Sequence, residues 1–242
     1  MTTFPQVLSG LLTRDAGRPL VTFYDDASGE RTELSVTTYA NLVAKVGSLL
    51  TDELDVERGG RLLVDLPVHW LGPVVLGAAW AGGLEVVWDG DADAVVTGPD
   101  GLARWAGYAS RIPVVASALV PLAVRFPEPP PPGVHDLGVE VWAQPDAYVA
   151  WSPPEDDDPA APGLTQAELW RAAAAGSHLT DGGRLLSEVS PASPSGLPSF
   201  TEPLARSGSL VLLAHATRER RERIVADERV TARFDPGQPA RS

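Results

Sequence analysis

Residues 61–88 contain an apolar strand, an apolar helix and a second apolar strand in direct succession. The strands are RLLVDL, from Arg61 to Leu66, and LEVVW, from Leu84 to Trp88. Between them, apolar residues from Trp70 to Ala79 lead to Gly82 and Gly83, a common helix stop. Strands joined in this way form a parallel pair with a right-handed crossover. The pattern therefore predicts a sheet that is covered by helices.

The same alternation continues on both sides of this unit. The runs Leu20–Tyr24 and Arg31–Leu34 flank the turn-rich DDASG and predict an antiparallel hairpin. A helix is expected from Thr37 to about Leu54, with Ser35 as its N-cap. Pro73 must lie in the first turn of the next helix or kink it. Residues 93–117 predict a further strand, helix and strand. Beyond residue 145, we expect strands at Tyr148–Trp151, Arg184–Val189 and Ser209–Leu213, and helices at Thr165–Ala175, Phe200–Arg206 and Arg218–Glu228.

These elements predict an α/β protein of two Rossmann-like subdomains, with mostly parallel sheets and an N-terminal β-hairpin. We place the first subdomain at residues 1–125 and the second at residues 146–231. Residues 126–145 begin with FPEPPPPG and are interpreted as an extended, proline-rich connector. Residues 232–242 are expected to form a frayed tail.

The charge and composition exclude several classes of function. The net charge is −13, so nucleic acid and anionic membranes are poor partners. The arginine-rich stretch Arg218–Arg223 alternates in sign and is expected to be a solvated helix face. The chain has no cysteine, which excludes disulfides, thiolate nucleophiles and cysteine-based zinc sites. With no leader pattern or long apolar span, we expect a cytoplasmic protein.

Residues 148–174 have the strand, loop and helix outline of a nucleotide-phosphate site, but little of its chemistry. Such a site needs backbone N–H groups brought together by glycines, hydroxyl groups and usually a lysine. The loop instead contains four prolines, which lack an N–H, and four consecutive carboxylates from Glu155 to Asp158. The chain's only lysine, Lys45, lies far upstream.

The order of these blocks resembles the opening of adenylate-forming (AMP-binding) enzymes, such as acyl-CoA synthetases, luciferases and adenylation domains of peptide synthetases. In the first half, the matching positions are Gly60, Arg61, Leu62, Pro67, Ala81, Gly82 and Val86. These residues are typical packing signals and carry no catalysis. The resemblance extends from about Leu20 to Thr231. The chain looks most like a family of short proteins related to the N-terminal part of these enzymes.

The resemblance also places the family's phosphate loop at Tyr148–Leu169. Ser152, Gly163, Thr165 and Leu169 match it, whereas the lysine, the glycine pair and most hydroxyls of the family loop are missing. In the later segment SPSGLPS, Pro194 stands where the family commonly has a histidine. The resemblance thus implies four candidate nucleotide-contacting residues, Ser152, Gly163, Thr165 and Gly196.

The sequence assigns no catalytic residue and no metal ligand. Ser152, Ser195 and Gly196 could line a cleft for a small molecule, but serine next to proline or glycine is more typical of plain turns. The acidic run could attract Mg²⁺, although a solvated loop is the better interpretation. The four histidines lack metal-site spacing and are expected to be surface or core residues.

Three functions remain open. The leading one is a degenerate relative without adenylation activity that binds a small ligand or a protein. The second is half of a split adenylating enzyme that a separate chain completes. The third is a structural or assembly role, with a homo-oligomer as one form. No cofactor is expected, and ATP, AMP or Mg²⁺ would bind only if the altered loop still holds them.

Overall fold

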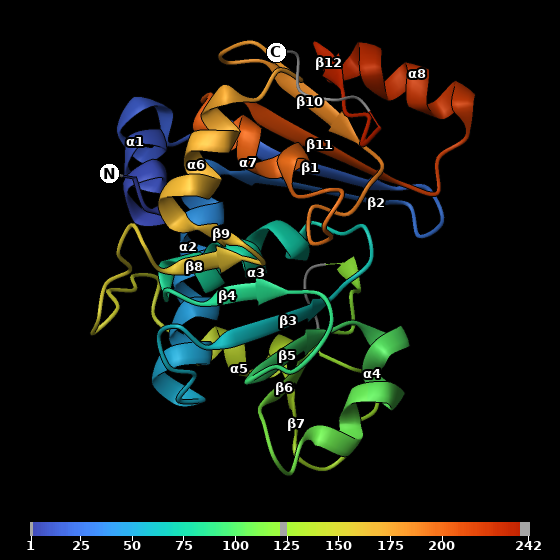
Figure 1. The fold of residues 1–242 in the computed structure, drawn as a ribbon. Helices are drawn as coiled ribbons and strands as arrows, with labels where there is room; N and C mark the ends of the chain where they lie inside the picture. The colour runs from blue at the N-terminus through green and yellow to red at the C-terminus, as the bar shows by residue number, and fades with distance from the viewer. Residues whose placement is uncertain (1, 122–124, 238–242) are drawn as a thin grey trace.

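The computed structural model describes residues 2–121 and 125–237 and contains two five-stranded sheets with helices packed between and around them (Figure 1). Residue 1 and residues 122–124 of the expected first subdomain lie outside the described residues, as do residues 238–242 of the expected tail. The two sheets, whose strands are mostly parallel, and the helices packed on them confirm the predicted α/β class.

One sheet combines both ends of the chain, in the strand order β12-β10-β11-β1-β2. The predicted hairpin is confirmed as β1 (Pro19–Asp25) and β2 (Glu30–Ser35), which are antiparallel. On its other side, β1 pairs in parallel with β11 (Ser209–Ala214), with Val21 opposite Leu210. Strands β10 (Arg184–Ser187) and β12 (Ala232–Arg233) complete the sheet.

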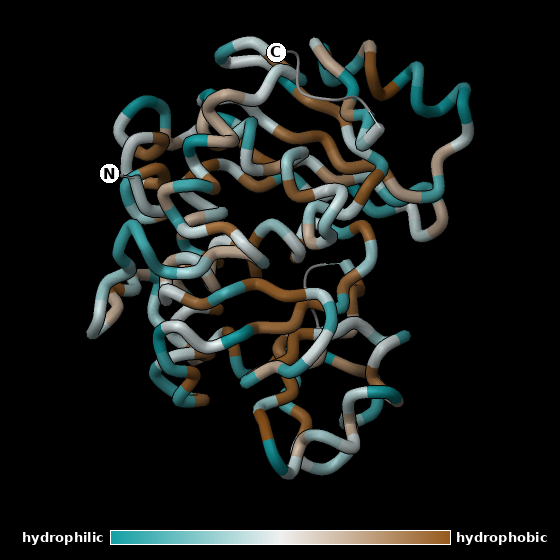
Figure 2. The backbone as a smooth tube through the Cα atoms, viewed as in Figure 1, coloured by the Kyte–Doolittle hydropathy of each residue, from teal (hydrophilic) through white to brown (hydrophobic). Residues whose placement is uncertain are grey.

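The second sheet is wholly parallel, in the order β4-β3-β5-β6-β7. Its apolar strands form the brown centre of the lower half in Figure 2. The predicted unit of residues 61–88 is confirmed, because β3 and β4 are neighbours and a helix connects them. The strands are β3 (Arg61–Asp65), β4 (Glu85–Val87), β5 (Ala94–Thr97), β6 (Val114–Ala116) and β7 (Val134–Asp136).

The connecting helix α3 (Leu71–Ala81) lies between the two sheets, and every one of its residues is buried (Figure 1). A helix that is apolar on all sides is stable only in such a place. Pro73 lies in its first turn, as predicted. Helix α2 (Val36–Ser48) packs beside it, is capped by Ser35 and continues as a π-helical turn over Leu49–Glu53.

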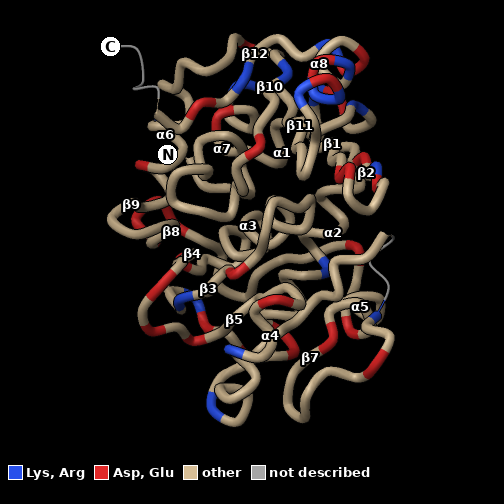
Figure 3. Tube along the Cα trace, turned by 90° about the vertical axis from the view of Figure 1, so that its right-hand side faces the viewer, with Lys and Arg blue, Asp and Glu red and all other residues tan. Residues whose placement is uncertain are grey.

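The remaining helices pack around this centre, and α7 is itself mostly buried. They are α1 (Phe4–Asp15), α4 (Pro99–Trp105), α5 (Leu137–Glu140), α6 (Gln166–Ala175), α7 (Pro198–Ala205) and α8 (Arg218–Asp227). Short 3₁₀ turns follow α4 at Ala106–Tyr108 and α5 at Val141–Ala143. A small hairpin of β8 (Pro159–Ala161) and β9 (Leu164–Thr165) precedes α6. Basic and acidic residues alternate along α8, as expected of a solvated face (Figure 3).

Several local predictions differ from the structure. Tyr148–Trp151 is not a strand, because these residues form an irregular segment without sheet partners. The connector at 126–145 is more than a spacer, since it contains β7 and α5. The tail begins with β12, which pairs with β10.

Helix α1 was not predicted, although the capping box of Thr3 and Gln6 and the early Pro5 are start signals for a helix.

The division into residues 1–125 and 146–231 stays a prediction, but the two sheets do not follow it. The hairpin at residues 19–35 pairs with β11, whose partner β10 also comes from the second half. Chain ends often meet in a domain, and a hairpin carries no sequence signal for the sheet it joins. No helix among the described residues is both long and apolar enough to cross a membrane.

Candidate functional site

The loop of residues 146–158 contains the first part of the segment Tyr148–Leu169 that the resemblance aligns with a phosphate loop. It projects from the left edge of the molecule beside α1, α2 and the β8-β9 hairpin (Figure 1). It contains five carboxylates, at Asp146 and from Glu155 to Asp158. Its C-terminal end is fixed by backbone contacts, because Gln166 and Ala167 at the start of α6 donate to the carbonyl oxygens of Asp158 and Asp156, at 2.8 and 2.9 Å. The loop is therefore attached firmly to helix α6.

Arg58, in the turn before β3, holds the loop through several side-chain contacts. Its Nε and Nη2 atoms donate to the two carboxylate oxygens of Asp158 at 2.7 and 2.8 Å. Its Nη1 donates to Ser152 Oγ at 3.0 Å, and Nη2 lies 3.2 Å from the Glu155 carboxylate. The hydrogen bonds to Asp158 raise the pKa of the guanidinium above its ordinary value. This cation is therefore committed to the loop's own acidic groups.

Lys45 holds the start of the loop. Its Nζ donates to the carbonyl oxygen of Gln144 at 2.5 Å and lies 3.0 Å from the Asp146 carboxylate. A lysine in a phosphate loop supplies a free ammonium group to the ligand. Here the chain's only lysine satisfies a backbone oxygen and a carboxylate instead.

Tyr148 anchors the centre of the loop to α2. Its hydroxyl is 2.9 Å from Thr51 Oγ1, and its ring lies so close to Gly47 that a Cβ there would be 3.2 Å from the ring. Burial raises the pKa of the phenol. The strand prediction failed here because the apolar side chains either pack on α2 or face outwards. They do not join a sheet.

An apolar cavity of about 450 Å³ lies between the loop and helices α1 and α2. Most of its lining is apolar and includes Leu8, Val43, Ala44 and Tyr148. The polar groups are few and lie on Ser9, Asn41, Asp146 and Tyr148. Cavities of this size and composition are typical of sites for apolar groups.

The four candidate residues named from the sequence have local structural roles. Ser152 accepts the hydrogen bond from Arg58. Gly163 has a φ of +75° in the β8-β9 turn, where glycine is favoured. Thr165 is the N-cap of α6 and forms a capping box with Glu168. Gly196 is buried, and a Cβ at this position would lie 1.9 Å from the Ser190 carbonyl oxygen.

The structure does not gather these four residues into one pocket. Ser152 faces Arg58, whereas Ser195, next to Gly196, lines a separate cavity of about 360 Å³ between α6 and α7. His178 also lines that cavity, and its Nδ1 is 2.8 Å from Glu202. Among the described residues, no group of three His, Cys, Asp or Glu side chains could hold a metal ion.

Sequence reasoning missed Arg58 and Gln166, although both organise the site. Arg58 meets Asp158 across 100 positions of sequence, and no local pattern indicates such a pairing. Gln166 is fully buried: its Oε1 accepts from the Phe4 N–H at 3.1 Å and its Nε2 donates to the Trp80 carbonyl oxygen at 3.1 Å. The Trp170 indole also donates to Oε1, at 3.2 Å. The sequence signal for Gln166 was its position one residue after Thr165, the N-cap of α6.

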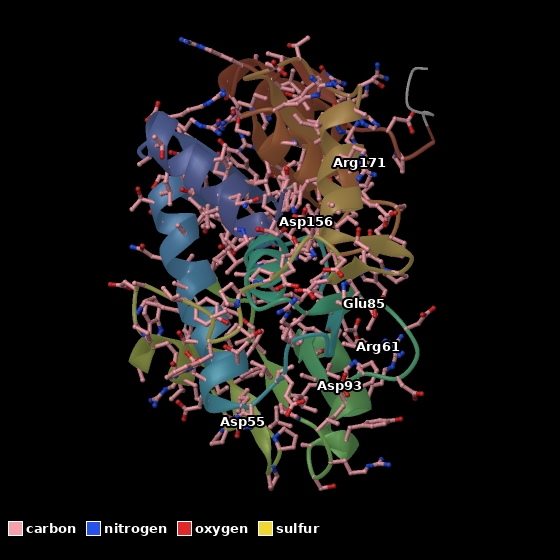
Figure 4. The ribbon with its side chains drawn as sticks, turned by 60° about the vertical axis from the view of Figure 1, so that its left-hand side comes forward. Asp55, Arg61, Glu85, Asp93, Asp156 and Arg171 are labelled. Atoms are coloured by element: carbon pink, nitrogen blue, oxygen red, sulfur yellow. The ribbon has the colours of Figure 1, made fainter. Side chains whose placement is uncertain are left out.

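Charged residues of both signs lie on this side of the molecule (Figure 4). Asp156 lies between α1 and α6 on the same side as Arg171, and both residues line a polar cavity of about 500 Å³. Farther down, Arg61 lies 3.5 Å from Glu85 and donates its backbone N–H to Asp93. The loop itself presents carboxylates and few unpaired cations. It is therefore better suited to binding a cationic group than a triphosphate.

Comparison with solved structures finds the same fold in adenylate-forming enzymes. An acyl-CoA synthetase of Brucella canis superposes with a TM-score of 0.76 at 19% identity, covering 94% of this chain and 46% of that chain. A benzoate CoA ligase of Burkholderia xenovorans gives 0.70 at 18% identity, with 95% and 49% covered. The N-terminal domain of FACL13 from Mycobacterium tuberculosis gives 0.67 at 16% identity, with 95% and 62% covered. The chain thus spans about half the length of the first two of these chains.

This agreement confirms the expected fold, that of the N-terminal part of adenylate-forming enzymes. No protein-family model matches the chain. A curated relative, a TIGR03089 family protein of Mycobacterium tuberculosis, is 35% identical, and the alignment covers 95% of this chain and 98% of that protein. Because the similarity spans both proteins almost completely, the chain belongs to the TIGR03089 protein family.

Proposed function

We propose that this protein does not form acyl-adenylates and that it acts as a binding protein for a small ligand or a protein partner. The observation that carries the proposal is the Arg58 clamp, which turns the former phosphate loop into an internally paired acidic segment. The cation nearest to the loop's carboxylates is thereby neutralised by them. An incoming triphosphate would meet the remaining carboxylates.

The chemistry of adenylation supports the same conclusion. The reaction requires stabilisation of negative charge on the α-phosphate and on the leaving pyrophosphate. Removing one such hydrogen-bond donor commonly costs about 3 kcal/mol, or roughly 100-fold in rate. Here the lysine is paired with Gln144 and Asp146, and the four prolines of residues 148–174 donate no N–H. Losing several donors together would leave no useful rate.

The apolar cavity supports the binding role. It lies directly under the altered loop, and Tyr148, Pro153 and Pro154 of that loop form part of its wall. The replacement of phosphate-binding residues by apolar ones thus exchanges an anion site for an apolar one. A change from an anionic ligand to an apolar one explains both the missing phosphate-binding residues and the apolar cavity.

The proposal is tested by the exchange of labelled pyrophosphate into ATP with acetate, benzoate and decanoate as acids. Purified protein is expected to give the rate of a heat-denatured sample, while an active acyl-CoA synthetase serves as the positive control. Acid-dependent exchange above that background would refute the proposal. Exchange that appears only after a separate C-terminal lobe is added would instead support the split-enzyme alternative.

A thermal-shift comparison then identifies the class of ligand. ATP, AMP and CoA are expected to leave the melting temperature unchanged, since a ligand stabilises only the form that binds it. Decanoate or another apolar probe that raises the melting temperature would identify a small-molecule site in the cavity.

A further inference from the structure

Large exposed apolar side chains gather in one short stretch of the chain. Among the described residues, five such side chains are exposed, and four of them fall within residues 139–151. Trp151 is 97% exposed and Val149 is 85% exposed. Tryptophan is usually largely buried, and exposed apolar clusters commonly mark interaction surfaces. The four residues are Val139, Trp142, Val149 and Trp151.

The loop backbone holds Val149 and Trp151 outwards. On one side, Tyr148 is bonded to Thr51, and on the other, Ser152 accepts from Arg58. The exposed pair therefore lies between two anchored neighbours. A surface that is already ordered loses less conformational entropy when a partner binds.

The apolar cavity opens next to this exposed pair. Val149 lines the cavity and is also largely exposed, and Trp151 lies in sequence between the lining residues Ala150 and Pro153. At about 450 Å³, the cavity has room for one large apolar side chain. Interfaces typically concentrate their binding energy where such an anchor fills a pocket.

The charge around the cavity selects the partner. Three of the five loop carboxylates pair with Lys45 or Arg58, whereas those of Asp156 and Asp157 make no ion pair with any described residue, although Asp156 lines a neighbouring cavity together with Arg171. A second copy of the chain, with a net charge of −13, would bring these acidic loops together. An anionic membrane is repelled for the same reason. Basic residues in a partner would be attracted.

We propose that Val149, Trp151 and the adjoining apolar cavity form a docking surface for a partner protein segment that carries an apolar anchor side chain flanked by lysines or arginines. This docking surface rests on the proposed binding role and specifies its partner. The anchor fills the cavity, Trp151 covers the apolar side of the segment, and Asp156 and Asp157 attract its basic residues.

The test uses a fluorescein-labelled amphipathic peptide of leucine and lysine as the probe. A peptide with glutamate in place of lysine and one with the leucines spread evenly around the helix are the controls. Fluorescence anisotropy is expected to show saturable binding of the first peptide only, weaker at 500 mM than at 50 mM NaCl. Trp151→Ser is expected to weaken binding at least about tenfold. The double change Asp156→Asn and Asp157→Asn is expected to reduce the salt dependence.

Tyr108→Ser is the matched control, because Tyr108 is a 43% exposed aromatic residue outside the loop. It is expected to change binding less than about twofold. A second readout follows from the absence of cysteine in the chain. Ala150→Cys, labelled with an environment-sensitive dye, is expected to shift to the blue when the peptide binds, and the same label on Tyr108→Cys is expected to stay unchanged.

Several results would overturn the docking surface. They are the absence of saturable binding, equal binding of the lysine and glutamate peptides, and peptide binding that Trp151→Ser leaves unchanged. Dimerisation in sedimentation velocity that Trp151→Ser abolishes would assign the surface to a second copy. Binding to phosphatidylcholine vesicles without peptide binding would assign it to lipid. Failure here is distinct from failure of the proposed function, which pyrophosphate exchange measures independently.

Discussion

Arg58 forms a two-pronged ion pair with Asp158, 100 residues later in the chain, through hydrogen bonds of 2.7 and 2.8 Å. The pair joins the turn before β3 to the end of the altered loop. The Asp158 side chain is 12% exposed, so solvent screens the pair only in part. The acidic run that gives the loop its character is thus a structural element of this fold.

Removing that clamp is expected to loosen the loop. Arg58→Ala should lower the free energy of unfolding by about 1 to 2 kcal/mol, because Asp158 loses two charge-assisted hydrogen bonds. Urea unfolding measures the loss, and hydrogen exchange should be faster over residues 146–158. Arg58→Lys should recover little, since lysine cannot form the paired geometry. Arg223→Ala, which breaks an exposed pair with Glu219, is the control and should have almost no effect. An equal loss from both alanine variants would contradict the clamp.

The buried amide of Gln166 is expected to contribute strongly to stability. Gln166→Met keeps the volume but removes the acceptor of the Phe4 N–H and of the Trp170 indole N–H, and the donor to the Trp80 carbonyl. The expected loss is about 2 to 4 kcal/mol in chemical unfolding. Gln144→Ala removes an exposed side-chain hydrogen bond to Glu53 and should change stability by less than about 0.5 kcal/mol. If Gln166→Met leaves the free energy of unfolding unchanged, the amide does not hold helices α1, α3 and α6 together.

Replacing Gly77 and Gly10 with alanine is expected to change the stability of the protein in opposite directions. A Cβ at Gly77, inside buried α3, would lie 2.1 Å from the Tyr39 hydroxyl and 2.8 Å from Val43. Gly77→Ala should therefore destabilise the protein by about 1 to 3 kcal/mol. Gly10, exposed in α1, has no atom within 4 Å of such a Cβ. Gly10→Ala should stabilise the protein by about 0.5 to 1 kcal/mol. Melting temperatures of both variants check the pair, and the same sign for both would be inconsistent with this packing.

Stability is expected to fall in acid partly through Glu228. Burial alone would raise the pKa of this carboxyl, but hydrogen bonds from Tyr24, Arg31 and Arg184 outweigh it and lower the pKa. A carboxylate with a lowered pKa in the folded state stabilises the protein at neutral pH. That contribution is lost as the pH falls below about 4, through the folded-state pKa.

Glu228→Gln removes this contribution, and the measurement is unfolding by urea at pH 7 and at pH 3.5. The variant should be less stable than the wild type at pH 7, and the difference should shrink at pH 3.5. Glu219→Gln, on the exposed face of α8, is the control and should show neither effect. A difference that stays constant with pH would exclude the proposed role of the charge.

The sequence predicted the regular parts of the fold because they depend on local signals. The β1-β2 hairpin, α2 with its Ser35 cap and the β3-α3-β4 unit each carry a period or a cap that is readable over a few residues. The choice of sheet for the hairpin depends on pairing between Val21 and Leu210. Such distant contacts leave no pattern in either segment.

The loop was predictable in composition but not in structure. Prolines and carboxylates predicted a loop without the residues that bind phosphate, whereas YVAW suggested a strand that does not form. Tyr148 packs on α2, Trp151 faces outwards, and Arg58 fixes the segment from a distant turn. Apolar alternation indicates burial on one side, but it does not say whether a sheet or a helix provides the contact.

Isothermal titration of the protein with ATP in the presence of Mg²⁺ tests the central claim most directly. The paired acidic loop predicts no saturable heat up to 1 mM ATP, and the same flat titration for Arg58→Ala, whose loop carries even more unpaired negative charge. Saturable binding of ATP·Mg²⁺ in the micromolar range by the wild-type protein would contradict the account.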